Sequence, residues 1–432
     1  MEERGVSSLQ KAKTQIQGET QEGSGAWNII PWRKLEEQVF SIQKRIYQAS
    51  LHGKIKEVQE LQKLLTKSQA ARIIAVRKVT QENTGKRTAG IDGIKSLPPE
   101  KRLDLAESIH PKYWKGYKPK PVRRVWIEKP GKTSKRPLGI PTIQDRALQA
   151  LIKIVMEPEW EARFEPRSYG FRPGRSAHDA IEHIFSTIRQ KPKYVFDADI
   201  KGCFDNIDHQ ALLEKIHTYP AIRKLIKAWL KAGVLEGQEF LETEKGAPQG
   251  SVISPLLANI ALHGIEEIAK KGYKAGEEKP ILVRYADDFI IMYSDKEKLE
   301  EAAKRVTEKL REIGLELNKE KTSIRHTLNK YEGNIGFTFL GFAIRQYAVG
   351  KTHSGKKSNG KLLGFKTIIK PSKQAINSHV KELGDQIKAY RTVSQETIIN
   401  KLNPIIRGWT NYFRTVVARG TFKTCVTAQP TP

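Results

Sequence analysis

Two adjacent acids, Asp287 and Asp288, lie between apolar, β-prone runs in the stretch VRYADDFIIMY, residues 283–293. Aspartate is common in turns, so an ordinary hairpin turn is one interpretation of this pattern. Carboxylates are also the oxygen ligands that a hard cation such as Mg²⁺ prefers. The spacing alone leaves both interpretations open.

A second acidic stretch, VFDADI, covers residues 195–200. Strand alternation puts Asp197 and Asp199 on one face and the apolar residues on the other. Aspartate is depleted in strands, so its presence here needs a reason. If these acids meet Asp287 and Asp288 at one edge of a sheet, their charges repel unless cations lie between them. Two Mg²⁺ ions about 4 Å apart would then serve an in-line phosphoryl displacement.

The elements that must position these acids alternate between strands and helices. Ser176 is the expected N-cap of a helix over 175–190, and Ser254 that of one helix over 254–270. The order strand, helix, hairpin, helix, strand predicts an antiparallel sheet packed against helices on one side, an α+β layer. The remaining predictions are helices within 32–80 and over 296–313, and strands within 122–142, 193–200, 281–293 and 336–344.

The C-terminal part of the chain differs in character. Residues 345–363 are basic and rich in Gly and Ser, which predicts a loop or linker. Between Arg345 and Gly420 there are 15 Lys or Arg residues against 3 Asp or Glu. A four-three-four-three spacing of apolar residues predicts a helical module here, carried by Ile376, Val380, Leu383, Ile387 and Tyr390.

Composition narrows the class of protein. The 432 residues suffice for two or three domains, and 76 Lys plus Arg against 48 Asp plus Glu give a net charge of +28. Such an excess favours a nucleic-acid partner. No apolar run reaches the roughly 18 residues of a membrane span, so no membrane is expected. Cys203 and Cys425 stand alone, which argues against a disulfide framework and for a reducing cytoplasm.

Three motifs in order, FDADIKGCFDNIDH, GAPQGSVISPLLAN and RYADDFII, resemble the polymerase motifs of reverse transcriptases. Two others, VRRVWIEKPGKTSKRPLGIPTIQDRALQ and SYGFRPGRSAHDAI, narrow the resemblance to the reverse transcriptase/maturase encoded by group II introns. GLELNKEKTSI and FTFLGFAI match two later blocks, and LNPIIRGWTNYFR resembles the maturase thumb region. The resemblance covers residues 80–420, and seven blocks in the expected order make it specific.

The resemblance implies a right-hand polymerase with fingers, an antiparallel-sheet palm and an α-helical thumb. Residues 1–80 would form an N-terminal helical extension that binds RNA. Residues 81–345 would form fingers and palm, and 346–432 a basic linker followed by a shortened thumb/maturase region. The chain shows no signature of the His-Asn-His endonuclease that many relatives carry, so we do not expect autonomous cleavage of a target strand.

Carried over to this sequence, Asp199, Asp287 and Asp288 would hold two Mg²⁺ ions, with the backbone carbonyl of Ile200 as a further ligand. Asp197 lies in the same block, and we expect it to be structural.

The resemblance also implies a site for the incoming dNTP. Phe204 matches an aromatic that would exclude a 2′-OH, and Gln249 matches a glutamine near the same nucleotide. Lys129 and Arg136 match basic residues that grip the triphosphate. In this lysine-rich loop the alignment can slip, so Lys132 or Lys135 remain alternatives.

The implied activity is RNA-directed DNA synthesis, in which the primer 3′-OH attacks the α-phosphate of a dNTP. Lys321 would protonate pyrophosphate or be a solvated lysine, and Arg172 and Arg175 would follow template phosphates or be solvated arginines. The implied partners are group II intron RNA, an RNA template, a DNA primer or target DNA, and dNTPs. The family also assists splicing, reverse splicing and retrohoming of its intron.

Three alternatives stay open. A non-catalytic maturase would only bind and stabilise intron RNA, although all three acids are present. An RNA-binding domain of the RRM kind should carry aromatics rather than acids on its central strands. Other reverse transcriptase lineages, such as retron types, would lack the basic N-terminal helices and the LNPIIRGWTNYF region.

Overall fold

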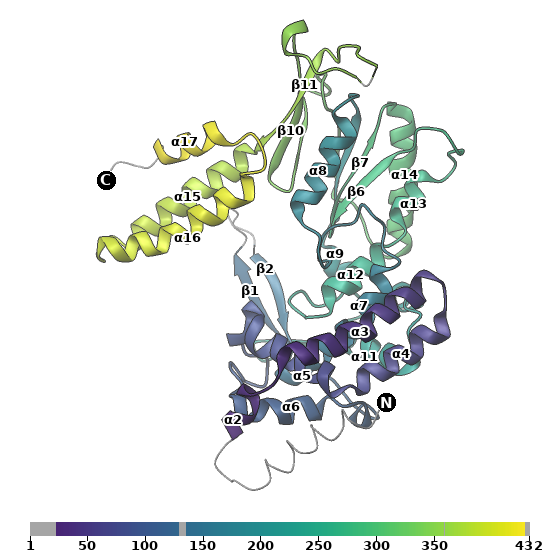
Figure 1. The fold of residues 1–432 in the computed structure, drawn as a ribbon, viewed down its shortest axis with the longest axis vertical. Coiled ribbons are helices and arrows are strands. Elements are labelled where there is room, and N and C mark those ends of the chain that lie inside the picture. The colour runs from purple at the N-terminus through teal and green to yellow at the C-terminus, as the bar shows by residue number, and fades with distance from the viewer. Residues whose placement is uncertain (1–22, 129–134, 358, 428–432) are drawn as a thin grey trace. The chain divides into compact units, whose positions relative to one another are not determined.

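The computed structural model describes residues 23–128, 135–357 and 359–427, and these form two compact units (Figure 1). The first unit comprises the described residues of 1–127, 136–164 and 202–261. The second comprises those of 128–135, 165–201 and 262–432. The chain therefore passes between the units several times, and both contain helices and sheet.

Helices dominate the first unit. The helices predicted within 32–80 are confirmed as α3 to α5, and α3 buries Leu35, Val39 and Ile46 along one face. The helices are α2 (Gly23–Asn28), α3 (Trp32–Leu51), α4 (Ile55–Lys67), α5 (Gln69–Arg77), α6 (Arg102–Ser108), α7 (Ile143–Glu161), α9 (Cys203–Asn206), α10 (His209–Lys215), α11 (Pro220–Leu230) and α12 (Ser254–Leu262).

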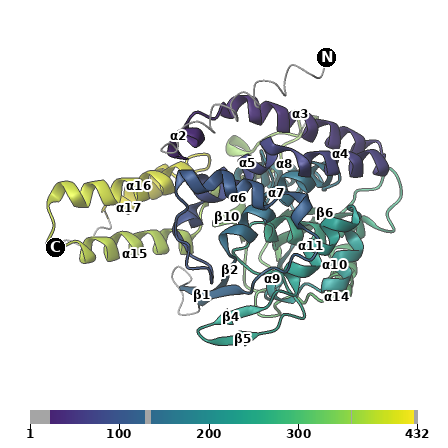
Figure 2. The same cartoon turned by 90° about the horizontal axis from the view of Figure 1, so that it is seen from below.

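The core helix of this unit is α7, which contacts α3, α4, α5 and α6. Thr142 caps it by accepting a hydrogen bond from the Asp145 backbone at 3.2 Å. A four-stranded sheet in the order β2-β1-β4-β5 completes the unit, with β1 and β4 parallel (Figure 2). The two strands predicted within 122–142 are confirmed. The strands are β1 (Val122–Glu128), β2 (Lys135–Ile140), β4 (Val234–Glu236) and β5 (Glu239–Leu241).

The second unit is built on an antiparallel sheet in the order β6-β7-β3-β8, with α14 packed on β3 and β7 and α8 on β6. The predicted α+β layer is confirmed. The elements of this layer are α8 (Ala177–Ile188), β3 (Tyr194–Asp199), α13 (Ile265–Lys270), β6 (Ile281–Tyr285), β7 (Asp288–Tyr293), α14 (Lys296–Glu312) and β8 (Ser323–His326).

A smaller antiparallel sheet and three helices follow in the same unit. These are β9 (Phe337–Phe339), β10 (Phe342–Ala348), β11 (Phe365–Pro371), α15 (Lys373–Ala389), α16 (Gln395–Phe413) and α17 (Arg419–Thr427). Phe342 packs edge-to-face on Phe413 with ring centroids 4.9 Å apart, and the Tyr412 hydroxyl donates to the Leu340 carbonyl at 2.9 Å. The predicted C-terminal helical module is therefore confirmed and shares a core with the sheet. No helix among those described is long and apolar enough to cross a membrane.

Ser176 caps α8 as predicted. Its side chain accepts from the Asp179 backbone, while the Asp179 carboxylate accepts from the Ser176 backbone at 2.6 Å, a reciprocal capping box. The prediction of one helix over 254–270 is wrong. The helix is interrupted at Gly264, which has φ 96° and donates its N–H to the Glu165 carboxylate at 2.5 Å. The Glu165 carboxylate, distant in sequence, and the left-handed conformation of Gly264 end α12, although the apolar periodicity of the sequence continues past this point.

The loop predicted over 345–363 begins too early. Residues 345–348 continue β10, which pairs with β11 from Phe342 opposite Pro371 to Ala348 opposite Phe365. The basic residues of these strands suggest a loop in sequence, but they alternate with buried ones such as Ile344 and Gln346. Cross-strand pairing with β11, which the local sequence pattern does not show, decides the outcome.

Candidate functional site

The hairpin of β6 and β7 presents the two adjacent acids. Tyr285 pairs with Asp288, so Ala286 and Asp287 form a two-residue turn, and Asp288 is the first residue of β7. Ala286 has φ 57°, the positive φ that tight hairpin turns require. The hairpin interpretation is therefore correct, and the metal-site interpretation stays a prediction.

Asp199 lies directly opposite Asp288, because β3 and β7 are antiparallel neighbours in this register. Opposed residues in such a pair have Cβ atoms about 5 Å apart. The predicted alternation in β3 is also observed, since Phe196 and Ala198 are buried while Asp197 and Asp199 are partly exposed. The structure thus brings acids from two distant parts of the chain to one edge of the sheet.

These acids perturb one another. Asp288 is accessible to water, but the protein atoms around its carboxylate and the negative charges of Asp287, Asp199 and Asp197 raise its pKa to about 6. Burial raises the pKa of Asp197 to about 6 as well, although the charge of Arg325 opposes the shift. Such crowding of carboxylates is a site that favours a cation.

Lys321 supplies one positive charge to this edge. Its Nζ donates to the Asp199 carboxylate at 2.7 Å. The GLELNKEKTSI segment holds it there, because Asn318 N–H donates to the Asp199 carbonyl and Lys201 N–H to the Glu316 carbonyl, both at 2.8 Å. Lys321 is therefore a half-exposed partner of a candidate catalytic acid, and its role as a proton donor stays a prediction.

A metal ligand set is only partly assembled. Within the described ranges, no three His, Cys, Asp or Glu side chains are arranged to hold a metal ion. The donor chemistry nevertheless fits a hard divalent cation, since carboxylates converge and the pKa of Asp288 is raised by their mutual repulsion. The two hydrogen bonds that join this end of β3 to residues 316–318 do not use the Ile200 carbonyl.

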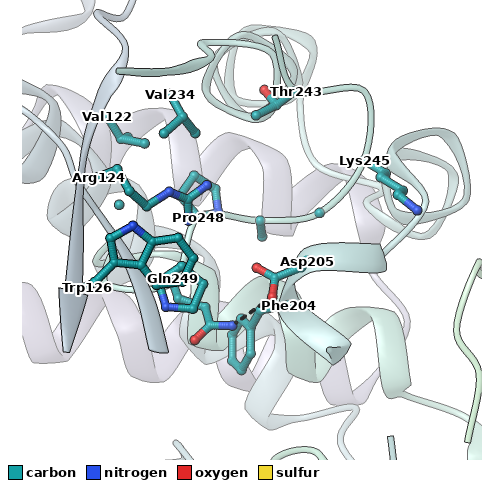
Figure 3. A pocket seen from close by; sticks show the side chains of 14 residues that line it. Val122, Arg124, Trp126, Phe204, Asp205, Val234, Thr243, Lys245, Pro248 and Gln249 are labelled. Carbon is teal, nitrogen blue, oxygen red and sulfur yellow. Dashed lines mark hydrogen bonds between the residues drawn. The ribbon is translucent and has the colours of Figure 1, made fainter. Parts of the chain in front are cut away.

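A pocket of about 200 Å³ lies wholly within the first unit. Two of the predicted dNTP contacts line it, Phe204 from α9 and Gln249 from the GAPQG loop (Figure 3). The Gln249 Nε2 donates to the Asp205 carboxylate at 3.2 Å. The pocket is lined by Val122, Arg124, Trp126, Pro137, Gly139, Phe204, Asp205, Val234, Thr243, Lys245, Gly246, Ala247, Pro248 and Gln249.

Backbone hydrogen bonds hold the GAPQG loop in place. Ala247 N–H donates to the Phe204 carbonyl and Gly139 N–H to the Gln249 carbonyl, both at 2.6 Å. Gly246 has φ 84°, and a Cβ there would lie 2.7 Å from the Asp205 carbonyl oxygen. A larger residue would therefore push this loop away from Phe204.

Sequence reasoning missed two pocket residues on β1. Arg124 and Trp126 alternate along β1 with residues that do not line the pocket, so the period of two was the available signal. The Trp126 indole donates to the Glu236 carboxylate at 2.6 Å, which orients its ring.

The basic candidates have different outcomes. Lys129 and its alternative Lys132 lie outside the described residues. Arg136 and Lys135 are exposed on β2, where the structure does not choose between them.

The assignment of Arg172 to template phosphates is wrong. Arg172 is 6% exposed, and its guanidinium donates to the Glu165 and Ser168 carbonyls at 2.8 and 2.7 Å. Arg175 is partly buried and donates to the Pro166 carbonyl at 2.6 Å.

Comparison with known proteins matches three families along the chain. Residues 27–109 match the N-terminal domain of reverse transcriptase, and residues 127–367 match reverse transcriptase (RNA-dependent DNA polymerase). Residues 374–427 match the group II intron, maturase-specific domain.

Individual relatives agree with these matches. Group II intron-encoded protein LtrA of Lactococcus lactis is 32% identical, over 69% of this chain and 61% of its own length. Protein YkfC of Escherichia coli is 31% identical, over 66% of this chain and 83% of its own. Maturase-like protein 1 of Euglena gracilis is 28% identical, over 89% of this chain and 76% of its own length. The chain thus spans about three fifths of the Lactococcus relative.

Proposed function

Because the chain belongs to the family of group II intron-encoded reverse transcriptases and maturases, we propose that it is an RNA-directed DNA polymerase that also binds its intron RNA. Its fold is the α+β, right-hand polymerase fold of that family, as the motifs predicted. We assign residues 1–80 to the N-terminal extension, 81–345 to fingers and palm, and 346–432 to linker and thumb.

The observation that carries the proposal is the opposition of Asp199 and Asp288 across β3 and β7, with Lys321 on Asp199. A splicing cofactor that only binds RNA has no need of acids that raise one another's pKa. Reverse transcriptases generally use divalent metal ions, and two Mg²⁺ ions held by Asp199, Asp287 and Asp288 would neutralise charge on the attacking and leaving oxygens. The Ile200 carbonyl is the proposed additional ligand.

The chain's own groups would then position the reactants. Phe204 and Gln249 line the pocket proposed for the sugar and base of the dNTP, and Phe204 would exclude a 2′-OH. Arg136, together with Lys129, would bind the triphosphate as cationic donors. Lys321 already holds an ammonium proton at the Asp199 carboxylate, where it can pass to the pyrophosphate.

Binding of intron RNA is proposed for the basic regions at both ends. The maturase-specific match lies over α15 to α17 and overlaps the stretch 345–420, which holds 15 Lys or Arg against 3 Asp or Glu. Phosphate neutralisation by such a surface gives affinity without sequence information. We propose that splicing, reverse splicing and retrohoming of the intron use this complex.

The test is extension of a DNA primer on an RNA template with dNTPs and Mg²⁺, comparing the wild type with Asp287→Ala. Asp295→Ala is a matched control, since Asp295 caps α14 by accepting from Lys298 N–H at 3.0 Å. We expect extension by the wild type and the control, and loss of at least 10³-fold in Asp287→Ala with RNA binding retained. If folded wild type binds intron RNA without extending any primer, the chain is a non-catalytic maturase.

A further inference from the structure

A segment preceding α8 runs beside the acid hairpin. Residues 165–172 contain SYGFR, the start of the SYGFRPGRSAHDAI motif, to which the proposed chemistry assigns no role. Arg284 N–H, in β6, donates to the Arg167 carbonyl, and Tyr169 N–H donates to the Arg284 carbonyl, both at 2.9 Å. The segment therefore adds backbone pairing to β6 just before the turn that carries Asp287.

Gly170 lies against this turn. A Cβ at Gly170 would clash with the Ala286 nitrogen and would lie 2.9 Å from the Tyr285 carbonyl carbon. Ala286 itself has φ 57°, a conformation that a non-glycine residue keeps only where its surroundings enforce it. The close approach of Gly170 supplies part of that enforcement.

The Arg284 side chain further constrains the backbone of Ala286. It is 1% exposed, and its Nη1 donates to the Ala286 carbonyl at 3.2 Å. Its Nη2 lies 4.0 Å from the Glu165 carboxylate. One buried guanidinium thus joins the turn to the 165–172 segment.

Glu165 is anchored in turn. Its carboxylate accepts from the His263 Nδ1 at 2.9 Å and from the Gly264 N–H at 2.5 Å. Arg172 donates to the Glu165 carbonyl. The turn is therefore tied, through Arg284 and Glu165, to the junction between α12 and α13.

We propose that Glu165, Gly170 and Arg284 are positioning residues that hold the Ala286–Asp287 turn in one geometry for catalysis. The inference rests on the proposed function, because it gives the hairpin acids their role. Buried ion pairs are often no more stabilising than apolar residues of the same volume, so stability alone does not account for a charged pair at this turn, and we infer a geometric role in addition. Misplacing catalytic groups by about 1 Å costs on the order of 10²-fold in rate.

The kinetic test compares Arg284→Met, Arg284→Lys and Gly170→Ala with the wild type in primer extension. Arg72→Met is the matched control, since Arg72 is also buried and donates to the Glu107 carboxylate at 2.8 Å and to the Ala106 carbonyl at 3.3 Å. We expect kcat per active site to fall about 10²-fold in Arg284→Met and Gly170→Ala. The KM for dNTP should stay near the wild-type value, the Mg²⁺ concentration for half-maximal rate should rise, and Arg284→Lys should restore part of the rate.

A purely structural role would lower the melting temperature and the fraction of active enzyme in all the variants, control included. It would leave kcat per active site and the Mg²⁺ requirement unchanged, and that result would overturn the proposal.

Hydrogen exchange provides a readout that needs no activity. Amides of residues 285–289 should exchange faster in Arg284→Met and Gly170→Ala than in the wild type, while amides of residues 195–198 in β3 stay protected. In the control Arg72→Met, the amides of residues 285–289 should stay as protected as in the wild type. Unchanged protection of the hairpin would refute the positioning role. A wild type that fails to extend primers would refute the proposed function, and the exchange data would still decide whether these residues hold the turn.

Discussion

At the tip of the β6–β7 hairpin, Asp288 has a pKa of about 6 because neighbouring protein atoms and three other aspartates disfavour its charged form. The same residue faces Asp199 across the strand pair. The charge of Asp288 therefore destabilises the folded protein when no cation is bound, and this destabilisation is measurable.

We expect Asp288→Asn to stabilise the protein at pH 7 in the absence of divalent ions. The pKa of Asp288 in the folded protein is raised from 3.8 to about 6, so ionising Asp288 costs folding free energy. The wild type is therefore free of this cost below pH 3.8 and bears it fully once the pH has risen through 6. After discounting for solvent screening, the variant should gain about 1 kcal/mol at pH 7 and lose most of this gain by pH 4. Added Mg²⁺ should raise the melting temperature of the wild type more than that of the variant. A variant less stable than the wild type at pH 7 without Mg²⁺ would contradict the assignment.

Phe204 gives a second prediction at this scale. Because its ring lines the pocket proposed for the nucleotide sugar, Phe204→Val should raise the ratio of ribonucleotide to deoxyribonucleotide incorporation by roughly 10- to 100-fold. The measurement is kcat/KM for UTP and dTTP on the same template. Phe240→Val on β5, outside the pocket lining, is the control and should keep the wild-type ratio. An unchanged ratio in Phe204→Val would place the sugar elsewhere.

Among the elements, the junction of α12 and α13 shows how tertiary contacts shape local structure. Glu165 is 6% exposed, and burial by itself would raise its pKa. The His263 hydrogen bond and the Arg284 charge outweigh burial and hold the pKa at about 2. The junction should therefore lose stability in acid.

This shift makes a pH prediction with a definite sign. The folded pKa of Glu165 lies below its ordinary 4.5, so its contribution is complete above pH 4.5 and is lost as the pH falls toward 2. The shift corresponds to about 3 kcal/mol. Chemical denaturation at several pH values should show wild type and Glu165→Gln converging from pH 7 to pH 2. Other carboxylates cancel in that difference, and a constant gap between the two proteins would show that the carboxylate charge is not what stabilises the junction.

For the molecule as a whole, the net charge of +28 is the dominant physical property. Self-repulsion of this size opposes folding and favours a polyanionic partner. The basic excess lies partly in the segment from Arg345 to Gly420, which overlaps the maturase-specific match over residues 374–420.

Affinity for intron RNA should therefore fall steeply with salt. A protein that neutralises six to ten phosphates loses about 10³-fold or more in affinity between 50 and 200 mM monovalent salt, and we expect a loss of that order. Fluorescence anisotropy with labelled RNA measures it, and sucrose at matched osmolality is the control. Salt-insensitive binding would mean that apolar or base-specific contacts dominate.

The sequence by itself was sufficient for elements whose signal is local. Ser176 capping α8, the hairpin around Asp287 and the alternation in β3 follow from short-range rules of hydrogen bonding and side-chain direction, and all three are observed. The family also follows from motifs that the sequence carries in order, and the comparisons agree.

Tertiary structure decided everything that depends on partners distant in sequence. The break at Gly264, the pairing of β10 with β11, the placement of Lys321 on Asp199 and the burial of Arg172 all join segments that no periodicity relates. The sequence does not distinguish a charged side chain that is solvated from one that is buried and hydrogen-bonded to backbone carbonyls. Only the folded chain determines which of these groups it meets, because burial and charge act through space.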